Sequence, residues 1–252
     1  MGNVTWTQRV MASVILGSLA ITGCAKPQGD RGGDDGKSSA SPSDSQPSAA
    51  SQPTTANPVD VKAAKARIDE FGPRARYAPK DGDLLKEIVI QDGSNVTAED
   101  LALFGKLSDL EKLQILNCRT LNDEMAAQLS GLKHLTSLAL TNTVINDTAV
   151  EAIVKSFPNL MELDLSSNTN MTNGVVKIIS ELGKLQRLTL VQNQVNDIGA
   201  QRLSKLENLR ALDLRGNMEA GDMALDVVAD LPKLTAFKHR STAVTDSGLE
   251  YL

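Results

Sequence analysis

The residues that could do chemistry in this chain are few, and the nucleophiles and bases come first. The 252 residues include two cysteines, Cys24 and Cys118, and two histidines, His134 and His239. Hydrolysis by a cysteine or serine needs a histidine within hydrogen-bond reach of the nucleophile. The two histidines lie 105 positions apart, and neither falls in register with a nucleophile. We therefore predict no enzymatic activity in this chain, and we interpret both histidines as structural.

Metal and phosphate chemistry are not indicated either. The chain has no phosphate-binding glycine loop and no metal-ligand spacing of cysteine and histidine. Aspartates recur about once in each copy of the sequence repeat described below, near the starts of predicted helices. Calcium binding is one interpretation of them. Capping of the helix N-terminus explains them at least as well. These aspartates are Asp123, Asp147, Asp197, Asp222 and Asp246. We predict no metal and no cofactor.

A repeat carries these side chains and begins near residue 85. Its first leucine recurs at steps of 24 or 25 residues, a period typical of stacked repeat proteins. Positions four and six are mostly aliphatic and alternate with other residues, which indicates a short strand with one buried face. Each strand must pair with the strands of neighbouring copies in one parallel sheet. The first leucines are Leu85, Leu110, Leu135, Leu160, Leu185, Leu209 and Leu234.

A turn and a helical pattern follow each predicted strand. The ninth position holds Gly93, Cys118, Thr143, Asn168, Asn193, Asn217 and Thr242. We predict that these side chains are buried at the turn, where asparagine can satisfy backbone groups and Cys118 is an inert thiol. A polar helix cap and apolar residues three and four apart come next, as in Asn146 before Val150 and Ile153. The helices would cover one face of the sheet.

These seven copies resemble leucine-rich repeats. The helix starts Val195-Asn196-Asp197-Ile198-Gly199-Ala200 and Val244-Thr245-Asp246-Ser247-Gly248-Leu249 are similar to those of the cysteine-containing, bacterial type of that family. The resemblance covers residues 85–252. It implies an α/β solenoid with a parallel sheet on the concave face and helices on the convex face. For function, it implies binding and names no ligand.

The amino terminus indicates export and lipid attachment. Arg9 precedes the run Val10 to Ile21, which is apolar but too short to span a bilayer and fits a signal peptide over residues 1–23. Leu19-Ala20-Ile21-Thr22-Gly23-Cys24 looks like a bacterial lipobox. That resemblance implies cleavage before Cys24 and attachment of acyl chains such as palmitate, and two or three chains hold a protein stably at a membrane. The alternative is an ordinary signal peptide followed by a chance cysteine.

The rest of the chain divides into three parts. Residues 24–58 are rich in Ser, Gly and Pro and read as a disordered tether behind Cys24. Residues 59–84 read as an N-terminal cap, with a helix stopped by Gly72 and a hairpin that covers the first repeat. Residues 85–252 are the seven repeats. We interpret the last copy as incomplete, because the chain stops inside its helix.

Charge limits the classes of partner. The formal net charge is −5, and the acidic excess falls on residues 59–252. An acidic chain without a basic cluster argues against nucleic acid and against electrostatic docking on anionic lipid.

The predicted location is the bacterial cell envelope. The lipoprotein resemblance implies the outer membrane or cell surface rather than the inner membrane, because Ala25 follows Cys24 and the sorting rule of enteric lipoproteins keeps those with aspartate at that place in the inner membrane.

The outward-facing strand positions form the candidate binding surface. Strands about 4.8 Å apart place positions three, five and seven in columns, so Glu162 lies beside Arg187 and Asp213 beside Lys238. One interpretation is a solvated face whose charges pair with each other and contribute little. The other is a polar recognition patch without Trp or Tyr, which would recognise its partner through charge. The candidate residues are Lys112, Gln114, Glu162, Asp164, Arg187, Asp213 and Arg215.

The predicted function is therefore a membrane-anchored interaction module. It would present its concave surface to a protein or glycan of the envelope. Two alternatives stay open: a structural envelope protein without a selective ligand, and a subunit that positions a substrate for another enzyme. The sequence leaves the ligand and the oligomeric state open.

Overall fold

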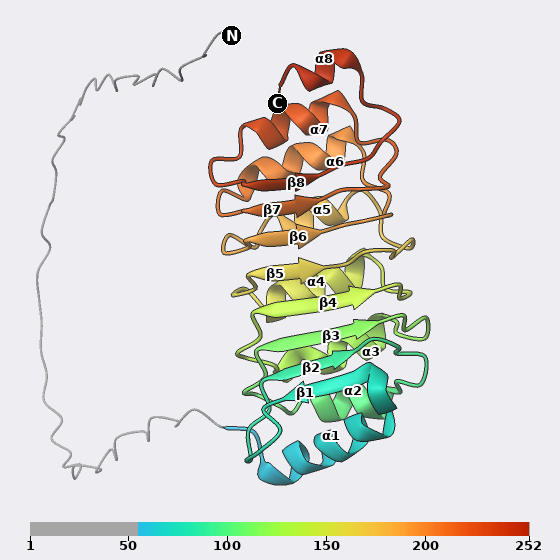
Figure 1. The fold of residues 1–252 in the computed structure, drawn as a ribbon, viewed down its shortest axis with the longest axis vertical. Coiled ribbons are helices and arrows are strands. Elements are labelled where there is room, and N and C mark those ends of the chain that lie inside the picture. Colours follow the sequence, from blue (N-terminus) through green and yellow to red (C-terminus); the bar gives the residue numbers. More distant parts are fainter. Residues whose placement is uncertain (1–54, 252) are drawn as a thin grey trace, which may run out of the picture. The chain divides into compact units, whose positions relative to one another are not determined.

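A computed structural model describes residues 55–251, which form an eight-stranded sheet with helices on one face (Figure 1). The predicted signal peptide, Cys24 and nearly all of the predicted tether lie outside the described residues. The strands are β1 (Ala75–Ala78), β2 (Glu87–Ile90), β3 (Lys112–Leu116), β4 (Ser137–Thr141), β5 (Glu162–Asp164), β6 (Arg187–Thr189), β7 (Ala211–Asp213) and β8 (Ala236–Lys238). Spatial order follows sequence order, so each strand lies beside the next one along the chain.

Each repeat contributes one strand and one short helix. The helices are α1 (Pro58–Glu70), α2 (Ala98–Phe104), α3 (Asp123–Ala127), α4 (Asp147–Ser156), α5 (Val175–Ile179), α6 (Asp197–Ala200), α7 (Asp222–Ala229) and α8 (Asp246–Leu249). Three 3-10 turns accompany them, η1 (Gly72–Arg74), η2 (Gln128–Gly131) and η3 (Gln201–Lys205). Among residues 55–251, no helix combines the length and apolar character that crossing a bilayer requires.

The register of the sheet follows the sequence period. Strands β2 to β8 pair in parallel, and position four of one repeat lies beside position four of the next, as in Leu138, Leu163 and Leu188. These side chains point away from the concave face and are at most 2% exposed. One continuous apolar layer lies between the sheet and the helices. The structure therefore confirms the predicted solenoid.

The turn after each strand explains the eighth and ninth positions together. Position eight takes the left-handed conformation in five consecutive repeats, at Asn117, Asn142, Ser167, Gln192 and Gly216, with φ between 51° and 81°. Asparagine and glycine tolerate that conformation best. The chain then directs position nine inward, and the asparagines there are buried, Asn168 and Asn217 completely. Burial of the ninth column is confirmed from Gly93 to Asn217, but the prediction is wrong for Thr242, which is exposed because no further repeat covers the last copy in the described residues.

Contacts between repeats correct the interpretation of the aspartate column. The helix caps are the preceding residues: Asn122, Asn146 and Asn196 each accept a backbone N–H of the first helical turn. Four of the aspartates instead accept backbone N–H groups from the next repeat, for example Asp123 from Asn146 at 2.9 Å; the four are Asp123, Asp147, Asp197 and Asp222. They therefore join neighbouring repeats. The sequence suggested capping because the cap and the following residue are both polar and adjacent.

The first repeat is covered by α1 and by β1, which pairs antiparallel with β2. Val61, Ala64 and Ile68 of α1 are buried against the apolar layer. Arg67 of the same helix forms an ion pair with Asp100 of α2, with Nε 2.7 Å from Oδ1 and Nη2 3.0 Å from Oδ2. This bidentate pair joins the cap to the first repeat.

Candidate functional site

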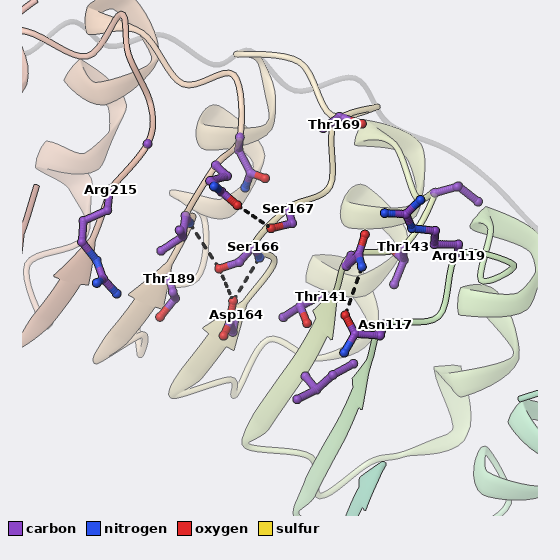
Figure 2. A pocket seen from close by; sticks show the side chains of 17 residues that line it. Asn117, Arg119, Thr141, Thr143, Asp164, Ser166, Ser167, Thr169, Thr189 and Arg215 are labelled. Atoms are coloured by element: carbon purple, nitrogen blue, oxygen red, sulfur yellow. Dashed lines mark hydrogen bonds between the residues drawn. The ribbon is translucent and has the colours of Figure 1, made fainter. Parts of the chain in front are cut away.

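The concave face carries a groove of about 1000 Å³ across strands β3 to β7. It lies over the carboxyl ends of these strands and the turns that follow them (Figure 2). Its walls are mostly hydroxyl and amide side chains, with a few aliphatic ones such as Leu116 and Val191. Asp164 and Ser166 lie between Thr141 and Thr189, and Arg119 and Arg215 stand at opposite ends (Figure 2).

The left-handed residues at position eight supply one wall of the groove. Asn142 donates through Nδ2 to Oδ1 of Asn117 at 3.0 Å, and Ser167 donates through Oγ to Oε1 of Gln192 at 3.3 Å. These bonds run between repeats, so the wall is a ladder of polar side chains. It offers amide groups to a ligand without carrying net charge.

Several predicted charges are engaged with each other. Lys112 lies 3.3 Å from Glu87, and Arg187 lies 3.6 Å from Glu162, the lateral neighbour that the sequence predicted. Ser137 also donates to Glu162 at 3.0 Å. Such exposed pairs contribute little to stability. Much of the predicted charge on this face is therefore neutralised locally.

The partner of Asp213 differs from the expected lateral contact. Lys238 lies beside Asp213 in the register of the sheet. The ion pair of Asp213 is instead with Arg215, two residues further along the chain, at 2.7 Å. Burial acts to raise the pKa of Asp213, and the hydrogen bonds from Arg215 outweigh it, so the pKa of this carboxyl is lowered.

Asp164 is the exception among the predicted residues. Its carboxylate accepts from the Oγ and N of Ser166, at 2.6 and 3.0 Å, and forms no ion pair within residues 55–251. Burial raises the pKa of Asp164, and the charge of Asp213 adds to the rise. Gln114 shares with it a smaller pocket of about 160 Å³. The groove therefore contains one carboxylate without a counterion among the described residues.

Strand periodicity did not predict that Arg119 and the residues at position eight line the groove. Arg119 follows Cys118, lines the groove and is exposed. Only positions three, five and seven point outward along a regular strand, so a prediction from strand periodicity ends at position seven. The left-handed residue brings the next side chains back to the groove. A run of Asn, Asn, Ser, Gln and Gly at one repeat position was the available signal.

The histidines and Cys118 lie away from the groove. His134 is exposed before β4, and Cys118 is fully buried with its Sγ 3.5 Å from Oγ1 of Thr120. His239 takes position six of the last repeat, stacks on Phe237 with a centroid distance of 5.4 Å, and shares a hydrogen bond between Nε2 and the Ala220 carbonyl at 2.9 Å. Within the described residues its buried Nδ1 has no partner.

We expect His239→Leu to weaken the acid sensitivity of the protein and to change its stability little at neutral pH. Burial lowers the pKa of His239, so the folded state favours the neutral ring. The unfolded chain binds a proton below about pH 6.5, and stability present above that value is lost as pH falls. The leucine restores the repeat pattern and removes an unpaired buried nitrogen, but it also removes the partner of the buried Ala220 carbonyl, so these effects offset each other and stability at pH 7.5 should change by less than about 1 kcal/mol. Thermal unfolding at pH 7.5 and 5.5 measures both effects, with exposed His134→Gln as control. A wild-type loss on acidification equal to that of His239→Leu contradicts the prediction.

Comparison with known proteins places this stacked strand–helix solenoid in a family. The sequence profile described as "FBD-associated F-box protein At5g56370, LRR repeats" matches residues 85–247. The chain belongs to this leucine-rich-repeat family, and the predicted resemblance is confirmed at that level. Leucine-rich repeats serve as protein-interaction modules, and the chain is one.

Two relatives show how much of a longer protein the chain matches. "Putative RNA-binding protein EEED8.10" of Caenorhabditis elegans is 27% identical over 133 residues, which are 49% of this chain and 18% of that protein. An internalin (inlF) of Listeria monocytogenes is similar with a TM-score of 0.37 and 18% identity, over 65% of this chain and 56% of the internalin chain. The chain thus spans less than a fifth of the nematode relative and just over half of the internalin.

Proposed function

We propose that this chain is the interaction module of a membrane-anchored protein of the bacterial envelope, and that it holds a protein partner in the concave groove. The observation that carries the proposal is the groove itself, with the unneutralised carboxylate of Asp164 between walls of amide and hydroxyl groups. A face that served only for spacing would need no such group. Catalysis is not part of the proposed role.

The surroundings of the groove favour protein over nucleic acid. A nucleic-acid site needs a basic face to neutralise phosphates. Here Lys112, Arg187 and Arg215 each lie beside a carboxylate, and among the described residues Arg119 is the one base lining the groove without an ion pair, which is too little positive charge for a phosphate backbone. The name of the nematode relative makes RNA the natural competitor in a binding test.

Capture from envelope extract tests the proposed groove. We expect the wild-type chain to retain a protein that Asp164→Ala/Arg187→Ala loses, because the double variant removes one acid and one base from the concave face. Glu151→Ala/Lys155→Ala is the matched control, since it removes an exposed acid–base pair from α4 on the convex face. If both double variants retain the same proteins as wild type, selective capture is wrong and a structural role is the better explanation. Retention of RNA instead of protein also contradicts it.

Lipid attachment at Cys24 supports the proposed location and has its own test. The motif Leu19-Ala20-Ile21-Thr22-Gly23-Cys24 supports it, together with the Ser-, Gly- and Pro-rich stretch that follows. We expect Cys24→Ser to move the protein from the membrane fraction to the soluble fraction and to abolish labelling by a palmitate analogue, since the acyl chains provide the anchor.

Cys118→Ser is the control for this experiment, because Cys118 is the other cysteine and is buried. It should keep both the label and the membrane association. Membrane retention of Cys24→Ser in wild-type amounts contradicts lipid anchoring.

A further inference from the structure

Two repeats present the same carboxylate in two states. Leu163-Asp164-Leu165-Ser166 and Leu212-Asp213-Leu214-Arg215 are equivalent segments of their repeats. Their aspartates stand in one row of the sheet, with only Thr189 between them. The segments differ in the residue two positions after the aspartate, which faces the same side of the sheet.

That residue decides whether the aspartate is neutralised. Arg215 Nε lies 2.9 Å from Oδ1 of Asp213, and its Nη2 lies 2.7 Å from Oδ2, so both oxygens are occupied. Ser166 donates twice to Asp164, and both bonds fall on Oδ1. Within residues 55–251, Oδ2 of Asp164 has no hydrogen-bond donor.

The charged neighbours do not supply a counterion. Arg187 on β6 lies beside Glu162 on β5, at 3.6 Å. Asp213 on β7 is a like charge that opposes ionisation of Asp164. On the β4 side the adjacent residue is Ala139, which carries no polar side chain and leaves space above the carboxylate. A cation from outside would meet the unoccupied oxygen directly.

We infer that the groove takes an extended segment of a partner protein, and that a lysine or arginine side chain of this segment pairs with Asp164 as Arg215 pairs with Asp213. The inference rests on the proposed function and adds the chemistry of the partner. The five strands under the groove span roughly 20 Å, the length of about six extended residues. Asn117, Asn142 and Gln192 line that path with side-chain amides, which suit the N–H and C=O groups of a peptide backbone.

A metal ion is a poorer occupant than a basic side chain. Within the described residues, no group of three or more His, Cys, Asp or Glu side chains is placed to hold a metal. A single carboxylate flanked by hydroxyl groups gives too few oxygen ligands for calcium. One carboxylate does match one ammonium or guanidinium group.

Binding of peptide pools to the full chain in uncharged detergent tests the inference. Each pool contains acetylated, amidated and fluorescently labelled decapeptides with random uncharged residues around one fixed central residue. That residue is lysine, arginine, norleucine or glutamate. We expect the lysine and arginine pools to bind about three- to tenfold more tightly than the norleucine pool, and the glutamate pool most weakly. Fluorescence anisotropy at low salt gives the dissociation constants.

Three variants connect this preference to Asp164. Asp164→Asn removes the charge and Ser166→Arg supplies an internal guanidinium, and each should abolish the preference for basic pools. Arg215→Ser makes the opposite exchange at the equivalent repeat, frees Asp213, and should retain the preference. Equal thermal midpoints confirm that the variants are folded.

The outcomes separate this inference from the proposed function. Equal binding of basic and norleucine pools by wild type, or a preference retained by both Asp164→Asn and Ser166→Arg, overturns the basic side chain but leaves protein capture in place. Absence of binding by every pool also overturns the inference. The proposed function fails only when capture from envelope extract shows no dependence on the concave face.

Discussion

Replacing Asn168 with alanine is expected to lower the free energy of unfolding by about 3–6 kcal/mol, because four hydrogen bonds to buried groups are lost together. Its Nδ2 donates to the carbonyls of Leu140 at 2.7 Å and Leu165 at 2.9 Å. Its Oδ1 accepts from the N and Oγ1 of Thr143, at 2.8 and 2.6 Å. The residue is 0% exposed, so water does not replace these partners without opening the turn.

The effect should reach beyond one repeat. Thr143 and Leu140 belong to the repeat before Asn168, so the amide holds two repeats together. A loss of several kcal/mol is a large share of the stability of a domain of this size. Urea denaturation followed by circular dichroism measures the loss. Because the contact between two repeats is weakened, we expect unfolding of the variant to deviate from a two-state transition.

Asn193→Ala provides the graded control. The Asn193 side chain makes two such bonds, to the carbonyl of Leu165 and from the N–H of Asn168, both at 3.0 Å, and the residue is 8% exposed. We expect its loss to be about half that of Asn168→Ala. Equal losses at the two positions, or a loss under about 1 kcal/mol at Asn168, mean that the hydrogen bonds of the buried ninth-position asparagines do not determine stability.

The sequence predicted the fold because a fixed period sets the register of the sheet. Once Leu138, Leu163 and Leu188 occur 25 residues apart, pairing of equal positions keeps all of them buried, and every outward column follows. The neighbour of Glu162 could be named for this reason. Burial of the asparagine column was predictable for the same reason.

Contacts other than those between equal positions of adjacent repeats could not be predicted from the sequence. Asp213 pairs along its own strand because the long arginine side chain reaches a neighbour two residues away as easily as one across the sheet. Asp123 and its equivalents contact the next repeat because of the direction in which the turn points them. Arg119 lines the groove only because the residue two positions before it is left-handed. Each depends on the path of a turn, which hydrophobic periodicity does not specify.

Replacing Asp100 with asparagine is expected to cost about 2–3 kcal/mol at pH 7 and to loosen α1 from the first repeat. The Asp100 side chain is 7% exposed and accepts from Arg67 at two atoms and from the Thr97 backbone N–H at 2.9 Å, completing a capping box at the start of α2. Removal of one partner from a buried pair is costly because the other charge stays behind. The Arg67 side chain is 30% exposed and regains some water, which keeps the loss below the usual range for fully buried pairs.

The pH dependence distinguishes loss of the ion pair from loss of packing. Burial acts to raise the pKa of Asp100, but the hydrogen bonds from Arg67 and Thr97 outweigh it, and the pKa in the folded protein is lowered. The stabilisation is therefore complete above the unfolded value of about 4 and is lost as pH falls through the folded value. Urea unfolding should show a constant difference between wild type and Asp100→Asn from pH 7 to about pH 5, and a shrinking difference below pH 4. The surface pair of Arg74 and Asp92 provides the control, because their side chains are 71% and 38% exposed, far more than that of Asp100, and Asp92→Asn should change stability less. A difference that persists unchanged to pH 2 assigns the loss to packing and contradicts an ion pair between the cap and the first repeat.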